Sequence, residues 1–367
     1  MTAAKDPQPF LLKEFFNRDF IEHLANAVAG TKAPFKKAAF VQDVLDADHK
    51  NRELKQRMRH TAAMLRRYLP EPYTDAVEIL MKASPHVTGF GAMVLPDFVE
   101  QFGLDHYDQS IAALELFTQS SSSEFAVRPF LIRYGATMER QMVLWSGHEN
   151  HHVRRLSSEG IRPRLPWAQP LPHLKADPSP IWPILENLNN DDSDYVRRSV
   201  ANNLNDISKD HPNLVIARAK TWYGQSEATN GIIRHACRTL IKAGNQEVLE
   251  LLGEGSAKAL QVALFTADDG SVSIGNHTFL ETHIRNTADR SIRLRLAYAI
   301  DFVKANGSVS RKVFSWQIVE LGASETRAFR RKHRFQQFTT RTHYPGSHRI
   351  HCIVNGEDRA TITIALT

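Results

Sequence analysis

The spacing of apolar residues changes once along this chain, and that change constrains the fold more than any other feature. From about residue 9 to 253, apolar side chains recur every three or four positions, with breaks at Gly, Pro, Asn and Asp, as amphipathic helices do. From about Leu260 onward, apolar and polar residues alternate, most clearly at 292–298 and 361–364, which is typical of half-buried strands. The sequence therefore predicts a helical region followed by a β-domain, joined near residues 253–256.

Turn dipeptides divide the alternating region into short strands. They are Asp269-Gly270, Asn306-Gly307, Pro345-Gly346 and Asn355-Gly356, and such pairs favour tight turns. Many short strands within about 100 residues indicate a β-sandwich of immunoglobulin size, although the Cys-Trp-Cys core signature is missing. We predict a helical domain over 1–256, with 1–105 as its N-terminal cap region, and an immunoglobulin-like β-sandwich over 257–367.

Composition places the chain among globular proteins of two or three domains. Of its 367 residues, 42% are hydrophobic and 23% charged, which excludes disorder as the main state because enough apolar surface can be buried. The longest apolar runs are shorter than the ~18–20 residues of a membrane span, and residues 1–9 carry no apolar signal core. Cys237 and Cys352 lie too far apart to suggest a disulfide framework or a thiolate metal site. We expect a cytoplasmic protein.

Net charge is concentrated in the β-region. Residues 259–367 hold 15 Lys+Arg and 9 Asp+Glu, which accounts for the whole excess of +6. Seven of these cations fall within 23 residues and alternate with aromatic side chains; Arg331, Lys332 and Arg334 are among them. A polyanion such as DNA is the natural partner for this surface. The alternative is a solubilising strand face whose aromatic residues point into the core.

An apolar-Arg step recurs inside the helical region. It is found in segments 125–131, 152–156, 195–200 and 232–236, at spacings of 26, 43 and 37 residues, near the period of helical-pair repeats. Each segment follows a candidate N-cap: Ser123, Asn150, Ser193 or Asn230. The preceding helices are predicted at 110–119, 137–145, 180–188 and 213–223. Stacked pairs of this kind form an α-solenoid of HEAT-like repeats.

The repeated arginine then acquires a geometric meaning. Stacking would place equivalent side chains in a row along one wall, thickened by the arginines beside them. The row consists of Arg128, Arg154, Arg197 and Arg234, with Arg155, Arg198 and Arg238 next to it. Guanidinium groups hold phosphates with paired hydrogen bonds, so duplex DNA is the favoured ligand. The alternative is that these arginines pair with acidic side chains of neighbouring repeats.

Three motifs resemble a known family. Segments 122–130, 151–167 and 194–208 are similar to the AlkC branch of the AlkC/AlkD DNA glycosylases, and the resemblance covers most of residues 10–253. It implies a bacterial repair enzyme of HEAT-like repeats followed by an immunoglobulin-like domain. It also implies cofactor-free excision of cationic bases, chiefly 3-methyladenine and also 3-methylcytosine, without turning the lesion into a pocket. Arg164, inside the second motif, joins the candidate DNA contacts.

The chemistry of such a reaction requires carboxylates near a sugar. A base alkylated at N3 is already cationic, so it leaves without a general acid, and positive charge develops on the deoxyribose. Glu159 is the first candidate to stabilise that charge and orient a water, Glu124 the second and Asp206 the third, while Trp167 offers an indole face to the sugar. Each carboxylate could instead cap a helix or form a salt bridge, and Trp167 could anchor the core.

One motif points to different chemistry. His148 to His152 match the H-E-x-x-H pattern of zinc proteases. Asn150, however, is a better N-cap than an interior residue, which would place His148 ahead of the helix and separate the imidazoles. We therefore expect no metal and no cofactor. Two other functions stay open, a non-catalytic DNA-binding protein and a protein-interaction scaffold. We expect the protein to be a monomer.

Overall fold

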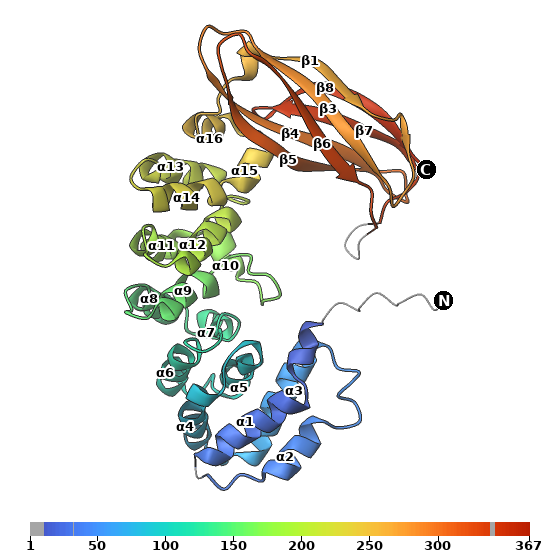
Figure 1. The fold of residues 1–367 in the computed structure, drawn as a ribbon. Helices are drawn as coiled ribbons and strands as arrows, with labels where there is room; N and C mark the ends of the chain where they lie inside the picture. Colours follow the sequence, from blue (N-terminus) through green and yellow to red (C-terminus); the bar gives the residue numbers. More distant parts are fainter. Residues whose placement is uncertain (1–10, 32, 338–341) are drawn as a thin grey trace, which may run out of the picture. The chain divides into compact units, whose positions relative to one another are not determined.

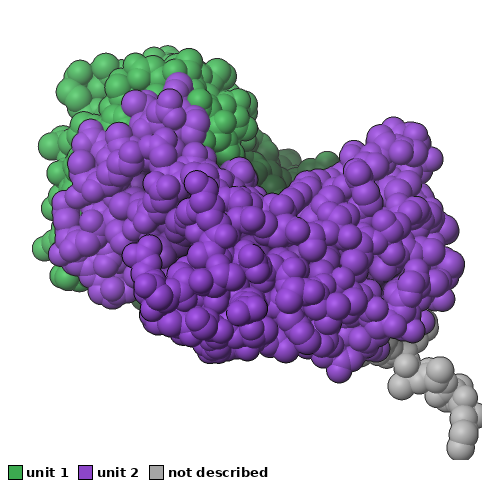
Figure 2. Space-filling view, turned by 90° about the horizontal axis from the view of Figure 1, so that it is seen from above, with its two compact units in different colours: residues 1–210 green, residues 211–367 purple. Residues whose placement is uncertain are grey.

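The computed structural model describes residues 11–31, 33–337 and 342–367 (Figure 1). The chain forms two compact units, Met1–Asp210 and His211–Thr367, which are coloured separately in Figure 2.

Unit 1 is helical in its described part, as the periodicity predicts. Its α-helices are α1 (Arg18–Gly30), α2 (Lys37–Val44), α3 (Leu54–Tyr68), α4 (Tyr73–Ala83), α5 (Val94–Phe102), α6 (Tyr107–Phe117), α7 (Val127–Tyr134), α8 (Ala136–Ser146), α9 (His151–Gly160), α10 (Pro172–Ala176), α11 (Trp182–Leu188) and α12 (Asp194–Ile207). Short 3-10 helices lie at η1 (Leu12–Phe15), η2 (Ser84–His86), η3 (Phe90–Met93) and η4 (Ser179–Ile181). The helices predicted at 110–119, 137–145 and 180–188 are α6, α8 and α11.

The predicted N-caps are partly confirmed. Asn150 caps α9, because its side chain accepts a hydrogen bond of 2.9 Å from the His152 amide, and Ser193 occupies the cap position of α12. The prediction for Ser123 is wrong, since α7 begins four residues later and the Ser123 hydroxyl donates to the Leu114 carbonyl. Asn230 is also wrong: it lies inside a helix that Ser226 caps.

Unit 2 joins a short helical segment to a β-sandwich. Its helices are α13 (Pro212–Trp222), α14 (Glu227–Ala236), α15 (Arg238–Lys242), α16 (Gln246–Leu251) and the 3-10 helix η5 (Ala257–Ala259). Its strands are β1 (Leu260–Ala267), β2 (Ser271–Val272), β3 (His277–Asn286), β4 (Ile292–Val303), β5 (Val309–Leu321), β6 (Thr326–Arg334), β7 (Gly346–Val354) and β8 (Glu357–Leu366). The helix predicted at 213–223 is α13.

The predicted immunoglobulin-like sandwich is confirmed. One sheet has the order β1-β3-β6 and the other β2-β8-β7-β4-β5, and every pairing is antiparallel except β2 with β8. Alternating side chains of both sheets, including Leu280, Ile300 and Ile350, fill the core between them. The Asn306-Gly307 and Asn355-Gly356 pairs form the β4–β5 and β7–β8 turns, where Gly307, Asn355 and Gly356 adopt positive φ.

The helical segment of unit 2 is attached to the sandwich through two glycines. Gly244, after α15, and Gly356, in the β7–β8 turn, both have positive φ, and a Cβ on Gly244 would lie 2.5 Å from the Gly356 carbonyl oxygen. Asn355 adds a hydrogen bond of 2.8 Å from its side-chain amide to the Gly255 carbonyl. Neither glycine can therefore be replaced without displacing the neighbouring backbone.

The described residues show neither a membrane-spanning helix nor a metal-binding cluster. No helix among the described residues is long and apolar enough to cross a bilayer. In that part of the chain, no group of three or more His, Cys, Asp or Glu side chains is arranged to hold a metal ion. Cys237 and Cys352 are free thiols, and burial raises their pKa to about 12 and about 11.

Candidate functional site

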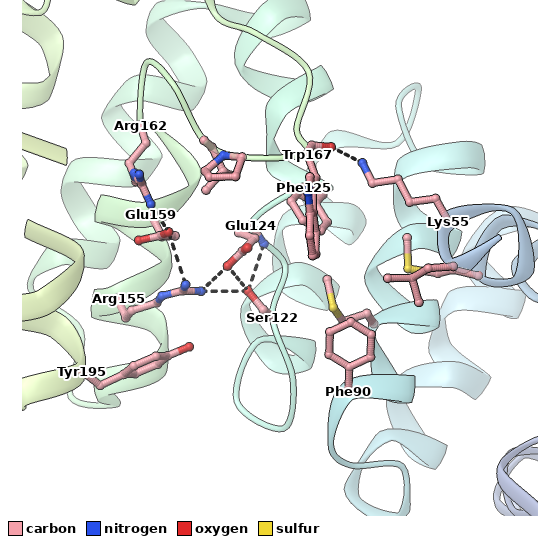
Figure 3. Close-up of a pocket in the computed structure, with 15 residues that line it drawn as sticks. Lys55, Phe90, Ser122, Glu124, Phe125, Arg155, Glu159, Arg162, Trp167 and Tyr195 are labelled. Atoms are coloured by element: carbon pink, nitrogen blue, oxygen red, sulfur yellow. Dashed lines mark hydrogen bonds and ion pairs between the residues drawn. The ribbon is translucent and has the colours of Figure 1, made fainter. Parts of the chain in front are cut away.

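A cavity of about 380 Å³ in unit 1 collects residues from distant parts of the sequence (Figure 3). Its apolar wall consists of Leu54, Met58, Phe90, Met93, Phe125, Leu165, Pro166, Trp167 and Tyr195. Its polar side consists of Lys55, Ser122, Glu124, Arg155, Glu159 and Arg162. The cavity thus combines aromatic surface with two carboxylates, the mixture expected of a ligand site.

The two carboxylates are held by one arginine. Arg155, on α9, forms an ion pair with Glu124, donates to the Ser122 hydroxyl at 3.0 Å and lies 3.5 Å from Glu159 Oε1 (Figure 3). Its guanidinium also stacks on the Tyr195 ring, 4.9 Å from the centroid. Burial lowers the pKa of Arg155, but Glu124 and Glu159 together raise it above its usual value. The arginine therefore stays charged and fixes both acids.

Glu159 is the most constrained of the acids. It is 6% exposed, and its Oε1 accepts a hydrogen bond of 2.6 Å from Arg162 while its Oε2 accepts one of 2.7 Å from the Ser199 hydroxyl. Glu159 lines the cavity because it lies in the last turn of α9. A carboxylate with this many partners is fixed in position before any ligand arrives.

Asp206 does not face the cavity. It is 1% exposed and accepts a hydrogen bond of 2.9 Å from Arg162 Nε, with Lys209 Nζ at 3.2 Å on its other oxygen. The expectation that it lies on the same surface as Glu159 is therefore corrected: it touches the site only through Arg162. Burial lowers the pKa of Arg162, and the Glu159 and Asp206 carboxylates together raise it above its usual value.

Together these groups form a buried ionic network. Arg155 and Arg162 contribute two positive charges against the three negative charges of Glu124, Glu159 and Asp206. The partly exposed Lys209 offsets the remaining charge only at the outer end, next to Asp206. On the cavity side, the Glu124 and Glu159 carboxylates are held in fixed positions by Arg155 and Arg162, so their oxygens are already oriented toward positive charge that develops on a ligand.

Trp167 lies on the rim with most of its surface free. It is 66% exposed, and its backbone has φ of 62°, a left-handed conformation that few residues other than glycine adopt without strain. Its carbonyl accepts a hydrogen bond from Lys55 Nζ, and the same ammonium lies 4.6 Å from the centre of the Phe125 ring. The predicted alternative of a buried anchor is excluded for Trp167. It applies instead to Trp145, which is 1% exposed and donates to Glu115.

Arg128 differs most from its predicted position. Its side chain is 0% exposed, and it donates to the carbonyls of Gly160 and Arg162 at 2.9 Å and of Gln169 at 2.5 Å. Burial, followed by the Arg162 charge, lowers its pKa to about 10. A phosphate cannot reach this guanidinium, so the predicted DNA contact is wrong. Arg128 instead organises the segment that carries Trp167.

The other predicted arginines of unit 1 are paired to different degrees. Arg154 donates to both Asp191 oxygens at 2.6 and 3.1 Å and to two loop carbonyls, which matches the alternative of pairing between repeats. Arg197 donates to the carbonyls of Asp191 and Asp192. Arg198 is 67% exposed beside Asp194, and the exposed Arg164 pairs with Asp210. Only these last two present much guanidinium surface to solvent.

The candidate contacts of unit 2 lie on two elements. Arg234 is exposed and forms an ion pair of 2.8 Å with Glu227, while Arg238 is half-buried and donates to the His235 carbonyl. Arg331, Lys332 and Arg334 are exposed on β6, and the aromatic residues on either side of them, Phe329 and Phe335, are buried. The inward aromatic residues match the alternative of a solubilising strand face, while the exposed cations are common to both interpretations.

Several site residues were not predicted. Lys55, Phe90, Phe125, Tyr195 and Ser199 all line or support the cavity. Phe125, Tyr195 and Ser199 belong to the motifs quoted above, so the motifs contained the signal. Lys55 and Phe90 lie outside those motifs, and nothing in the local sequence connects either residue to the site.

Comparisons with known proteins agree with this architecture. The family model for the C-terminal Ig-like domain of the uncharacterised protein YhaZ matches residues 261–367. The chain is 45% identical over 346 residues to the uncharacterized protein YhaZ of Bacillus subtilis (strain 168), covering 94% of this chain and 96% of that one. It also matches Pseudomonas fluorescens alkylpurine DNA glycosylase AlkC, solved bound to DNA containing an abasic site analog. That match has a TM-score of 0.94 and 36% identity, and covers 98% of this chain and 100% of the other.

The chain belongs to the AlkC family. The resemblance drawn from the sequence is therefore confirmed. The motifs that carried it converge on one place, since residues of segments 122–130, 151–167 and 194–208 all line the 380 Å³ cavity. In this AlkC-family chain the cavity is the candidate functional site.

Proposed function

We propose that this protein is a DNA glycosylase that hydrolyses the N-glycosidic bond of cationic alkylated bases in duplex DNA, chiefly 3-methyladenine and also 3-methylcytosine. One observation carries the proposal: Glu124 and Glu159 are fixed by Arg155 at the polar side of a cavity whose rim is the exposed Trp167. A family relative acting on alkylpurines in DNA supports it.

The proposed reaction uses charge rather than acid catalysis. An N3-alkylated base departs as a neutral molecule, so the barrier lies in the positive charge that develops on the deoxyribose. Glu124 and Glu159 stabilise this charge because their oxygens are already oriented and cost no reorganisation as the bond breaks. The same carboxylates accept a proton from the water that attacks C1′, and Glu159 is the first candidate for that role.

Trp167 contributes an apolar face. An indole ring attracts a cation through its quadrupole and excludes bulk water where it lies against a sugar. The exposure of Trp167 leaves this face free, while Lys55 and Arg128 hold the segment behind it. Asp206 acts as a positioning residue through Arg162 and not by contact with the substrate.

Excision without base flipping is part of the proposal. Enzymes that flip a base read its hydrogen-bonding edge with polar groups in a pocket. Here the hydrogen-bonding groups of Ser122, Glu124, Arg155 and Glu159 are already bonded to one another or to neighbouring side chains. The cavity is therefore better suited to a sugar than to the edge of a base.

Single-turnover base release tests the proposal. Wild-type protein is expected to release free 3-methyladenine from methylated duplex, equally with and without a chelator. Glu159→Gln should slow release by about 10²–10³-fold, since it removes one preorganised charge, while duplex binding is retained. Glu149→Gln, at an exposed glutamate outside the cavity, is the matched control and should be fully active.

The outcomes separate the rival functions. Duplex binding without any base release would indicate a non-catalytic DNA-binding protein, and absence of binding would favour an interaction scaffold. If Glu159→Gln releases the base at the wild-type rate, the assignment of Glu159 is wrong. Sedimentation should give a monomer, and fractionation should find the protein in the cytoplasm.

A further inference from the structure

A second cavity lies inside unit 2, where its helices meet the five-stranded sheet. This seam cavity has a volume of about 280 Å³. It is lined by Arg234, Arg238, Ile241, Lys242, Leu252, Glu254, Arg293, Arg295, Ser315 and Ile318. The helical residues come from α14, α15 and the segment after α16, and the others from β4 and β5 (Figure 1). Its lining is dominated by cations.

Charge in the seam cavity is strongly unbalanced. Five cationic side chains surround one carboxylate, Glu254, which is 1% exposed. Glu254 is bonded to Arg295 through both oxygens and lies 3.3 Å from Arg293 Nε. Lys242 forms no hydrogen bond or ion pair with any described residue, and Arg293 leaves half of its side chain exposed. Lys242 and the exposed half of Arg293 are therefore available to a ligand. Arg234 and Arg295 are already paired with Glu227 and Glu254.

The register of β4 and β5 explains why the cations gather there. Arg293 and Arg295 alternate along β4 with the buried Leu294 and Leu296, so both arginines point away from the sandwich core. Arg295 pairs with Ile318 across the strands, and a bulge after Leu296 brings Ser315 opposite Ala297. Two arginines and a serine hydroxyl thus share the outer face beneath α15.

The walls of the seam cavity are rigidly connected. The contact of Gly244 with Gly356 fixes the end of α15 on the sheet. Asn355 accepts a hydrogen bond of 2.7 Å from the Arg295 amide and donates one of 3.2 Å to the Arg293 carbonyl. An adjoining hollow of about 300 Å³ shares Lys242, Arg295 and Ser315 with it and continues along the sheet. The site is built before a ligand arrives.

We propose that the seam cavity binds a backbone phosphate of duplex DNA, separately from the site that excises the base. The ligand rests on the proposed function, which makes DNA the substrate. Guanidinium forks and an ammonium match the oxygens of a phosphodiester. The five cations exceed Glu254 and the Glu227 that pairs with Arg234 by about three positive charges, which favours an anion over a neutral ligand. These contacts do not depend on the DNA sequence, because they are made to the sugar-phosphate backbone of the DNA and not to its bases.

Salt dependence of binding to undamaged duplex tests this proposal. With ~5–6 phosphates neutralised, the wild-type slope of log K against log salt is expected near −5. The double variant Lys242→Gln/Arg293→Gln should shift the slope by about +1, because one phosphate contact is lost, and weaken binding at least tenfold at roughly 150 mM salt. The matched control is Lys258→Gln/Lys304→Gln, which removes the same charge from exposed positions of unit 2 outside the cavity. The control should shift neither quantity to that extent.

Other measurements keep the result interpretable. Both double variants should unfold at the wild-type temperature, because neither Lys242 nor Arg293 is buried. Calorimetry with inorganic pyrophosphate provides a second arm. If Lys242→Gln/Arg293→Gln abolishes pyrophosphate binding but leaves the DNA slope unchanged, the site serves a free phosphate and the proposal fails. It also fails if the two double variants behave alike.

The test is independent of catalysis. Undamaged duplex reports binding whether or not the protein releases a base. If the wild-type protein releases no base but Lys242→Gln/Arg293→Gln still reduces the salt slope, the proposed function is wrong and the phosphate site is supported. If the protein releases the base normally but the double variant and wild type have the same salt slope, the proposed function is supported and the phosphate site is wrong.

Discussion

The two cavities of this protein use arginine in opposite ways. In the cavity of unit 1, Arg155 and Arg162 form ion pairs with carboxylates of the protein itself. The buried network has three carboxylates for these two arginines. In the seam cavity of unit 2, five cations surround a single buried acid. The first arrangement suits developing positive charge and the second suits an anion.

The difference teaches that an arginine-rich sequence segment does not by itself indicate a nucleic-acid surface. Arg128 and Arg234 occupy the same place in the recurring apolar-Arg step, yet one is completely buried and the other is exposed. What decides between them is which acceptors the fold brings within reach. The following predictions test that distinction.

The largest effect is expected at Arg128. Arg128→Met leaves two buried carbonyls and the partly buried Gln169 carbonyl without their donor, so the free energy of unfolding should fall by about 2–4 kcal/mol. Because the side chain does not reach solvent, the salt slope of DNA binding should stay the same. Urea unfolding and a salt titration check both points, and a slope reduced by about one would return Arg128 to the DNA-binding set.

Asp97 should make the stability of unit 1 depend on pH. It is 2% exposed on α5, and burial, then the nearby Glu100 charge, raises its pKa to about 7. Because the folded state holds this proton more tightly than the unfolded state, stability should fall as pH rises from about 4 to about 7, by roughly 2–3 kcal/mol. Asp97→Asn should remove that decline in thermal unfolding scans at several pH values.

Lysine and arginine neighbours do not reverse the sign for Asp97. Arg59, at 3.7 Å, and Lys55 favour the charged form but only partly offset burial. If Asp97→Asn unfolds with the same pH dependence as wild type between pH 4 and 7, the carboxyl is already ionised in the folded protein and the assignment is wrong.

Trp167 should separate rate from stability. Its exposure means that Trp167→Ala costs less than about 1 kcal/mol of unfolding free energy, whereas excision should slow by about 10–100-fold. Trp167→Phe should recover part of the rate because a ring face is restored. A large fall in melting temperature would instead show that the indole packs against the protein.

The smallest effect is expected at Arg198. Its ion pair with Asp194 is exposed on both sides, so Arg198→Gln should leave unfolding within about 0.5 kcal/mol of wild type. If Arg198 contacts DNA, the salt slope should shift by about one. An unchanged slope would remove the residue from the DNA-binding set.

The sequence predicted the positions of helices and turns better than it predicted which of their side chains are buried and which face the cavity. Apolar spacing and turn dipeptides depend on local geometry, so α6, α8, α11, α13 and the β7–β8 turn were expected close to where they occur. The burial of Arg128 could not be expected, because its acceptors are carbonyls 32 to 41 residues further along the chain. Asp206 turns away from the cavity for a similar reason, since Arg162 lies 44 residues before it.

The candidate site was partly predictable through its motifs. Glu124, Glu159 and Trp167 were expected and do line the cavity, but the arginine that joins the two acids was expected to bind phosphate. The seam cavity could not be predicted, because Lys242 and Arg293 meet only through packing of α15 on β4.

The meeting of Gly244 and Gly356 has a practical consequence for dissecting the protein. A fragment cut at residue 256 would separate Gly244 and Leu249 from the β7–β8 turn that they lie against at Gly356. It would also take Ile241 away from the hollow that it lines with Ala297 and Ile353. Expression of residues 211–367 keeps these contacts within one fragment.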